Sequence, residues 1–435
     1  MAIKKRGLVL GATTVASVAV VVTGAGIHLS QGQAFFKESP KELIDEVWQL
    51  IDHEYVDETF NEQDWQAVRI DYLNREYGSS EDAYEAIREM LEGLGDVYTR
   101  FMDPQEFRNM QIDTSGELTG VGIQITQDED SEEIVVVSPI EQTPAYEAGV
   151  LSGDIIRAID GQTTEGMDLN EAVSLIRGPV NSEVTLTLQR DDETLNVTVN
   201  RARIEIHPVR YSYETGNEGG IGYIRLTQFS ANAAVEMREA IQELEDRDVT
   251  GYVLDLRSNP GGLLYSSIDI AQMWLREGTI VSTVNRQGIV DENAAGDRAL
   301  TDKPLVVLVD GGSASASEIL SGALQDNDRA ILVGTKTFGK GLVQSVRGLA
   351  DGSGVAVTIA KYLTPDGRDI NELGIEPDVI VELSEEDREL LAEDREKIGT
   401  MEDPQYATAI EVLADLIRGE RESAQLGPDQ QKAAL

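Results

Sequence analysis

The sequence contains no cysteine and only three histidines, His28, His53 and His207. Without cysteine there is no disulfide framework, no thiol nucleophile and no thiolate ligand for a metal ion. The histidines are far apart, and none has the HExxH-like spacing that places two imidazoles on one helix face. We therefore expect a protein that works without a metal ion or other cofactor.

Basic residues are also scarce, because 36 Lys and Arg stand against 79 Asp and Glu, for a net charge of −43. An excess of this size makes the surface repel the phosphates of nucleic acids and anionic lipids, so we expect no nucleic acid partner. It indicates a strongly solvated acidic surface that suits high salt. The length of 435 residues allows two or three domains, each with its own core.

The N-terminus carries one long run without charge. Residues 7–29 lack charged side chains and follow the basic residues Lys4, Lys5 and Arg6. A basic segment before such a run is typical of an export signal or of a single membrane anchor. We assign residues 1–35 to one of these two alternatives and expect the protein to work outside the cytoplasm.

Residues 36–114 are predicted to be helical. The stretch SPKE (39–42) combines an N-cap serine, a first-turn proline and a capping-box glutamate. Leu43, Val47 and Ile51 then follow at helical spacing. This pattern indicates a packing or homodimerisation element, and nothing in it suggests chemistry.

Residues 115–203 change to short β-runs with glycine and Asp/Asn turns, interrupted by one helical stretch at 168–176. Together with SGDII (152–156), the loop TGVGI (119–123) makes this region resemble a PDZ domain. A glycine-rich loop before an edge strand can bind a peptide's terminal carboxylate through N–H groups, while the peptide extends the sheet. The alternative is that the glycines only shape a turn. The predicted peptide-binding residues are Gly120, Val121, Gly122 and Ile123.

Residues 204–383 alternate between predicted strands and helices, which indicates an α/β core. Between an apolar strand at 304–309 and a helix beginning near Glu318 lies GGSASASEIL (311–320), with three alternating serines. A serine at such a junction lies near backbone N–H groups at the positive end of a helix, where an oxyanion can be stabilised. This spacing alone does not decide which serine is a nucleophile.

Serine needs a base, and with histidine unavailable the alternative is a lysine whose neutral form is favoured by burial. Lys340, in TFGKG (337–341), is the best candidate because its apolar and glycine neighbours suit close packing. Gln344 is four residues further on. In an extended segment this even spacing places it on the same face as Lys340, where it can orient the amine.

Two long motifs, GGSASASEILSGALQD (311–326) and VGTKTFGKGLVQ (333–344), are similar to the signature of the C-terminal processing peptidases, or tail-specific proteases. The resemblance extends from about residue 38 to 383 and includes RSNPGG (257–262). It implies an α/β serine protease core with an inserted PDZ domain and with N-terminal and C-terminal helical segments. The predicted parts are 1–35 (signal peptide or anchor), 36–114 (helical region), 115–203 (PDZ domain), 204–383 (protease core) and 384–435 (charged helical extension and tail).

Carried over by position, the resemblance implies that Ser315 is the nucleophile, Lys340 the general base and Gln344 the orienting third member. It implies an oxyanion hole made by the N–H groups of Ala316 and of Gly261 or Gly262. Supporting roles follow for three further residues, namely Glu318, Asp326 and Thr337. The family often has Asp-Pro-Tyr-Thr where this chain has DVYT (96–99), which leaves the catalytic assignment unchanged.

The resemblance implies a serine endopeptidase that captures free C-terminal tails of proteins with its PDZ domain and cleaves near them. Residues 60–107 look most like the cyanobacterial and chloroplast branch, which includes the enzyme that matures the photosystem II reaction-centre precursor. This branch implies the thylakoid lumen or periplasm. Two alternatives are a non-catalytic PDZ scaffold, which needs no Ser315–Lys340 pair, and an acyl-transfer enzyme with a similar glycine oxyanion hole.

Overall fold

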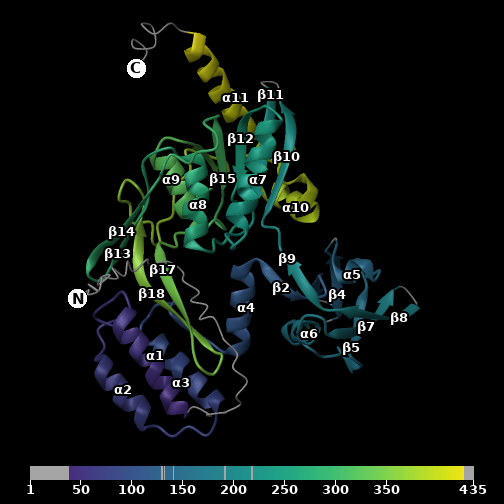
Figure 1. Cartoon of the computed structure of the whole chain (residues 1–435), viewed down its shortest axis with the longest axis vertical. Coiled ribbons are helices and arrows are strands. Elements are labelled where there is room, and N and C mark those ends of the chain that lie inside the picture. The colour runs from purple at the N-terminus through teal and green to yellow at the C-terminus, as the bar shows by residue number, and fades with distance from the viewer. Residues whose placement is uncertain are drawn as a thin grey trace, which may run out of the picture. The chain divides into compact units, whose positions relative to one another are not determined.

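The computed structural model describes residues 39–425 except 129–130, 132, 141, 191–192 and 217–218 (Figure 1). The predictions for residues 1–35 and for the tail beyond 425 therefore lie outside the described residues. Contacts divide the chain into two compact units. Unit 2 contains Arg108–Arg210 and Ser230–Glu236, and unit 1 contains the remaining residues. Among the described residues, no helix is both long and apolar enough to cross a membrane.

The helical region opens unit 1. Its elements are α1 (Pro40–Glu54), α2 (Trp65–Asn74) and α3 (Ser80–Glu92), followed by the short strand β1 (Arg100–Met102). The capping box predicted at its start is present, because the Ser39 N–H donates to Glu42 Oε2 at 2.9 Å. The apolar faces of α1 and α3 form one core with Val355 and Val357 of a later strand. The helices are thus packed onto the rest of unit 1.

A mostly parallel sheet forms the centre of unit 1, with the strand order β10-β11-β12-β15-β16-β19. Alternate residues of its buried strands face opposite helix layers. Tyr252 donates to Glu245 and packs edge-on against Trp274 on one side, whereas Val253 packs with Leu413 on the other. The elements are β10 (Val209–Gly216), β11 (Gly219–Leu226), α7 (Ala233–Asp246), β12 (Val249–Asp255), α8 (Leu264–Trp274), β15 (Leu305–Val309), α9 (Ala316–Asp326), β16 (Ile331–Gly334) and β19 (Val379–Ile380).

A second sheet in unit 1 is antiparallel and joins the helical region to the core. Its path is β1-β18-β13-β14, and β17 pairs with β18 on the other edge. Figure 1 shows the long β17 and β18 strands reaching down to α1 and α3. The elements are β13 (Thr279–Asn285), β14 (Gly288–Ala294), β17 (Leu342–Gly348) and β18 (Gly354–Leu363).

The C-terminal segment differs from the predicted extension. The described part contains α10 (Glu385–Glu393), the 3-10 turn Arg395–Lys397 and α11 (Pro404–Gln425). Along α11, Tyr406, Ala409, Leu413 and Ile417 form an apolar stripe that packs on the central sheet. The protease core therefore does not end at residue 383, because α11 covers one face of its sheet. The many charged residues of the C-terminal segment made this apolar stripe hard to recognise in the sequence.

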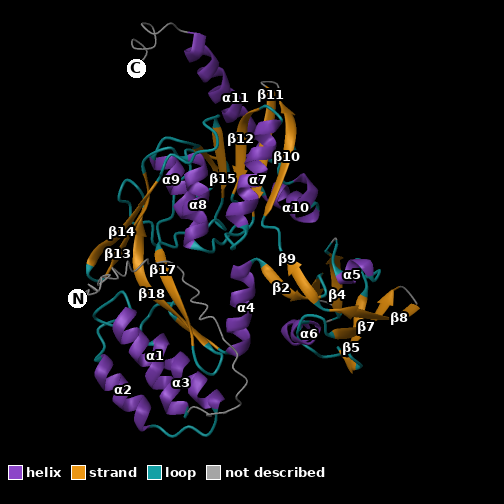
Figure 2. Cartoon of the chain, in the orientation of Figure 1, coloured by secondary structure: helices purple, strands orange, loops and turns teal. Residues whose placement is uncertain are grey.

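Unit 2 has the strand order β3-β4-β5-β7-β8, with β6 paired to β5 and a separate β2–β9 pair (Figure 2). Its core alternates along the strands, as in Val184, Leu186 and Leu188. The elements in and bordering this unit are α4 (Pro104–Ser115), β2 (Glu117–Gly120), β3 (Ile123–Gln127), β4 (Ile134–Pro139), α5 (Pro144–Glu147), β5 (Ile155–Ile159), β6 (Gln162–Thr163), α6 (Leu169–Ile176), β7 (Glu183–Arg190), β8 (Glu193–Asn200) and β9 (Ala202–Glu205).

Candidate active site

Ser315 lies on the turn that connects β15 to α9. It is the N-cap of α9 and has φ 54° and ψ −112°, a combination that non-glycine residues rarely adopt. Such strain costs about 1–3 kcal/mol and persists only where the surrounding structure enforces it. A strained strand-to-helix turn is also how hydrolases expose a nucleophilic serine beside helix N–H groups.

The neighbouring serines have structural roles. The buried Ser313 hydroxyl donates to the Leu256 carbonyl at 2.8 Å and accepts from the Asp310 N–H at 3.0 Å. The buried Ser317 hydroxyl donates to the Asn259 carbonyl at 2.9 Å. Ser315 is only partly buried. Of the three alternating serines, Ser315 is therefore the one whose position suits a reacting group.

Glu318 ties the serine turn to the lysine loop. Its carboxylate is completely buried, and Oε2 accepts from the N–H groups of Ser315 at 2.8 Å and Lys340 at 2.9 Å. Oε1 accepts from the Thr337 hydroxyl at 2.6 Å and the Gly339 N–H at 2.7 Å. One carboxylate oxygen thus brings together the backbones of the two residues predicted to be nucleophile and base.

Lys340 is held by its main chain at both ends of the residue. Its N–H bonds Glu318, and its carbonyl accepts from the Tyr362 hydroxyl, which also contacts the Ser315 carbonyl at 3.1 Å. Tyr362 is buried in β18, and its hydroxyl connects the Lys340 carbonyl with the carbonyl of the serine turn. The backbone position of Lys340 relative to Ser315 is therefore determined from two sides.

The lysine amine lies in an environment that favours its neutral form. Burial lowers the pKa of Lys340, and the charge of Arg100 acts in the same direction, against the opposing carboxylates of Asp96 and Glu318. Its Nζ lies 4.7 Å from the centre of the Tyr98 ring. We missed Tyr98 in the sequence, because it lies in the helical region, where no pattern indicated chemistry.

The RSNPGG turn lies directly against Ser315. Gly261 has φ +99°, and a Cβ there would stand 2.9 Å from the Ala316 nitrogen, so only glycine permits this approach. The Gly261 N–H donates to Asn259 Oδ1 at 2.9 Å. Among the bonds made within the described chain, the N–H groups of Gly262 and Ala316 have no acceptor. Of the two glycines that we predicted as alternatives, Gly262 therefore has the amide that can serve an oxyanion.

A buried ion cluster supports this turn from behind. Arg257 bonds Asp255 and Asp403 at 2.7 Å each, and its Nη1 bonds Gln405 at 3.0 Å. Although burial alone would raise the pKa of Asp255, the Arg257 guanidinium keeps that pKa below its ordinary value. Since Asp403 and Gln405 belong to the C-terminal segment, that segment helps to hold the RSNPGG turn.

The two remaining predicted side chains, Gln344 and Asp326, have hydrogen-bond partners other than Ser315 and Lys340. Gln344 Nε2 lies 3.5 Å from Thr358 Oγ1, and within the described chain it makes no hydrogen bond with Lys340. The β17–β18 register shifts between Val343 and Gln344 because β18 carries one extra residue there, Ile359, so Gln344 pairs with Thr358. Asp326 pairs with Arg368 and accepts from the Asp366 N–H at 3.0 Å, so it anchors a neighbouring loop.

The residues predicted to bind a peptide line a pocket in unit 2. Gly120, Val121, Gly122 and Ile123 line a pocket of about 170 Å³ together with Ile125 of β3 and Val173, Ile176 and Arg177 at α6. The carbonyls of Val121 and Gly122 accept from Ala145 and Ile140 at 2.9 Å each, which fixes the loop. Among the described strands β3 stands at the sheet edge, where an added peptide strand can pair.

Comparisons with known proteins identify relatives of both parts of the chain. The profile of peptidase family S41 matches residues 220–381, and that of the PDZ domain matches residues 135–190. The chain is 47% identical over 367 residues to the carboxyl-terminal-processing protease of Synechocystis, covering 83% of this chain and 86% of that protein. It is 42% identical over 348 residues to carboxyl-terminal-processing peptidase 2, chloroplastic, of Arabidopsis thaliana, covering 77% of this chain and 68% of that protein.

A solved structure of a photosystem II D1 C-terminal processing protease is 37% identical to this chain, with a TM-score of 0.57. The match covers 86% of this chain and 100% of that chain.

Proposed function

Given that this chain belongs to peptidase family S41 and is a serine-type C-terminal processing peptidase with a PDZ domain, we propose that Ser315 and Lys340 perform the cleavage. The family, fold and enzyme class predicted from the sequence are confirmed by the same matches. The observation that most supports the dyad is the Glu318 carboxylate oxygen, which accepts from both the Ser315 and the Lys340 N–H.

The reaction proceeds through an acyl-enzyme. Neutral Lys340 accepts the Ser315 hydroxyl proton as Oγ attacks the scissile carbonyl carbon, and the resulting oxyanion is stabilised by the N–H groups of Ala316 and Gly262. Lys340 then gives that proton to the leaving amine, and the C–N bond breaks. A water molecule loses a proton to Lys340 and attacks the ester, after which Ser315 recovers its proton. No metal is required in these steps.

The PDZ domain selects the substrate by its free C-terminus. The Gly120–Ile123 loop offers N–H donors to a carboxylate, and the apolar residues of β3 and α6 accept an apolar last side chain. The photosystem II D1 precursor is the substrate we propose, by analogy with the solved D1 processing protease. The enzyme would then act after export, in the thylakoid lumen or periplasm, with residues 1–35 as export signal or anchor. Dimerisation through the helical region remains a prediction.

The dyad is tested with Ser315→Ala, Lys340→Ala and the control Lys336→Ala on a peptide with an apolar free C-terminus. Lys336 is an exposed lysine of the same loop, paired with Glu376 at 3.1 Å. Mass spectrometry should find truncated product with wild type and control and none with the dyad variants. Product from Ser315→Ala would refute the nucleophile. Binding without cleavage by wild type would favour the PDZ scaffold.

Tail capture is tested with the same peptide as a free acid and as a C-terminal amide. An amide lacks the charge that the loop N–H groups bind, so the acid should be cut faster. Equal rates for the two peptides would exclude carboxylate capture as the basis of selection.

A further inference from the structure

Tyr98 contributes an aromatic face to the active site from a region that we expected only to pack. The Lys340 Nζ lies 4.7 Å from its ring centre, within the range in which a ring face attracts an ammonium. We propose that Tyr98 is a positioning residue whose ring holds the protonated Lys340 ammonium. Once the amine is neutral, it leaves the ring and accepts the proton of Ser315. This inference rests on the proposed function, in which Lys340 is the base.

The main chain of Tyr98 is fixed by its own loop, through bonds that do not involve the lysine. The Asp96 carboxylate accepts from the Tyr98 N–H at 2.9 Å and from the Thr99 hydroxyl at 2.7 Å, which closes a tight turn. Thr99 Oγ1 in turn accepts from the Thr358 N–H of β18 at 3.0 Å. Thr358 belongs to the β17–β18 hairpin that directly follows Lys340. The Tyr98 turn and the lysine loop are therefore both attached to this hairpin.

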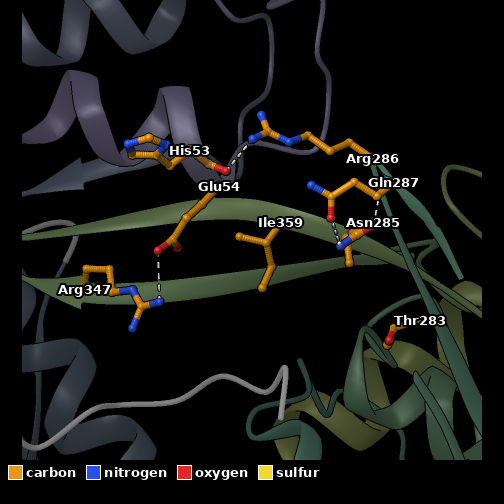
Figure 3. Close-up of a pocket in the computed structure, with 9 residues that line it drawn as sticks. His53, Glu54, Thr283, Asn285, Arg286, Gln287, Arg347 and Ile359 are labelled. Carbon is orange, nitrogen blue, oxygen red and sulfur yellow. Dashed lines mark hydrogen bonds and ion pairs between the residues drawn. The ribbon is translucent and has the colours of Figure 1, made fainter. Parts of the chain in front are cut away.

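Further contacts fasten the helical region to the same sheet. Figure 3 shows Arg286, from the β13–β14 hairpin, donating to the His53 carbonyl at the end of α1, at 2.6 Å. It also shows Arg347 of β17 paired with Glu54 at 3.0 Å. The Val56 N–H donates to the Thr358 carbonyl at 2.8 Å. These bonds keep the segment that leads to Tyr98 in register with β18.

The main chain of Lys340 is held, which leaves its side chain as the part that can reposition the amine. Its N–H is held by Glu318 and its carbonyl by Tyr362, so the four-carbon stem alone decides where the amine lies. The charged and titratable groups acting on the amine are Asp96, Arg100, Glu318 and Tyr98 itself. Asp96 and Glu318 favour the ammonium and Arg100 opposes it, while the ring face adds to the favourable side.

The sign of the expected effect follows from this balance. A ring face stabilises the ammonium and not the neutral amine, so removing it lowers the pH at which Lys340 becomes a base. The strength of a cation–π contact depends on whether it is exposed or partly desolvated. Over that range, its loss would lower the pH at which the lysine becomes a base by about 0.4–1.5 units. Burial raises the pKa of Tyr98, as do the nearby carboxylates of Asp96, Glu318 and Glu372, which favours the neutral phenol.

The test compares the pH dependence of kcat/KM for wild type, Tyr98→Phe and Tyr98→Leu, from about pH 6 to the ordinary lysine range near 10.4. Phenylalanine keeps the ring face, and leucine keeps an apolar filler without one. We expect the rising limb of Tyr98→Leu to move to lower pH by about half a unit or more, and that of Tyr98→Phe to stay in place. If Tyr98→Leu does not fold, Tyr98→Met replaces it.

Two failures can be told apart. If Lys340→Ala keeps its activity, the proposed function fails, because the lysine is then not the base. If Lys340→Ala is inactive while the Tyr98→Leu limb coincides with that of wild type or moves to higher pH, only the role of Tyr98 is overturned. A purely structural role would lower the melting temperature and activity of Tyr98→Leu without moving the limb, which also contradicts the inference.

Discussion

Replacing Glu318 tests how the two halves of the site are held together. Its Oε2 serves the N–H groups of Ser315 and Lys340, and its Oε1 serves Thr337 and Gly339. In Glu318→Ala these donors lose their acceptor in a fully buried place. An unsatisfied buried donor costs about 1–3 kcal/mol, so we expect the free energy of unfolding to fall by about 4 kcal/mol or more.

Glu318→Gln should be much milder, because an amide keeps one oxygen. Its favoured orientation directs that oxygen at Ser315 and Lys340, since the Thr337 hydroxyl is able to turn and accept from the new NH₂ group. The Gly339 N–H and the turned Thr337 O–H then lose this acceptor, against four donors in Glu318→Ala. We therefore expect about half of that loss, about 2 kcal/mol or more. The register between Ser315 and Lys340 survives, so partial peptidase activity should remain.

The assay is denaturant unfolding followed by circular dichroism, with kcat/KM on one peptide measured in parallel. Glu376→Gln is the matched control, because Glu376 is exposed and its side chain pairs with the exposed Lys336 at 3.1 Å. Surface changes of this kind alter stability by within about 0.5 kcal/mol. A Glu318→Ala variant as stable as this control would refute the bridging role, and so would an inactive Glu318→Gln variant with unchanged stability.

Two further predictions concern the rest of the protein. Asp403→Asn breaks a buried pair with Arg257, so we expect a loss of about 3–5 kcal/mol in unfolding experiments, and an unchanged stability would show that the cluster is dispensable. The net charge of −43 makes the compact state self-repelling. Since the Debye length shrinks to about 3 Å at 1 M, the melting temperature should rise from low to molar potassium chloride, and a flat or falling curve would contradict this.

The parts of the site that were predictable from the sequence lie in short, continuous motifs. Ser315 and Lys340 stand in stretches whose order and spacing resemble one family, and the structure brings those stretches together on Glu318. The PDZ-like loop was recognisable for the same reason. In each case the residues that act together are near in sequence, or belong to motifs that are long enough to be specific.

Other details depend on side chains whose positions no motif encodes. Our choice of Gly262 over Gly261 for the proposed oxyanion hole rests on the Asn259 side chain, which accepts from the Gly261 N–H. The partner of Gln344 is set by an extra residue, Ile359, in the facing strand β18, which the spacing of Lys340 and Gln344 does not reveal. The sequence did not reveal the apolar stripe of α11, because many charged residues surround it. We therefore did not expect the C-terminal segment to pack on the core, and its buried Asp403 was not predicted.

Tyr98 shows the limit most clearly. It is separated from Lys340 in sequence by the whole PDZ domain and most of the central sheet. It comes close to the amine where β1 pairs with β18 and Thr99 bonds Thr358. Pairing between distant segments is set by how the helical region packs on Val355 and Val357, which a local pattern does not contain. The packing that we predicted for residues 36–114 is thus the same interaction that brings an aromatic face to the lysine. Residues 36–114 were recognised only by their helix periodicity. Through Tyr98, in the turn after α3, this region nevertheless contacts the amine that we propose as the base.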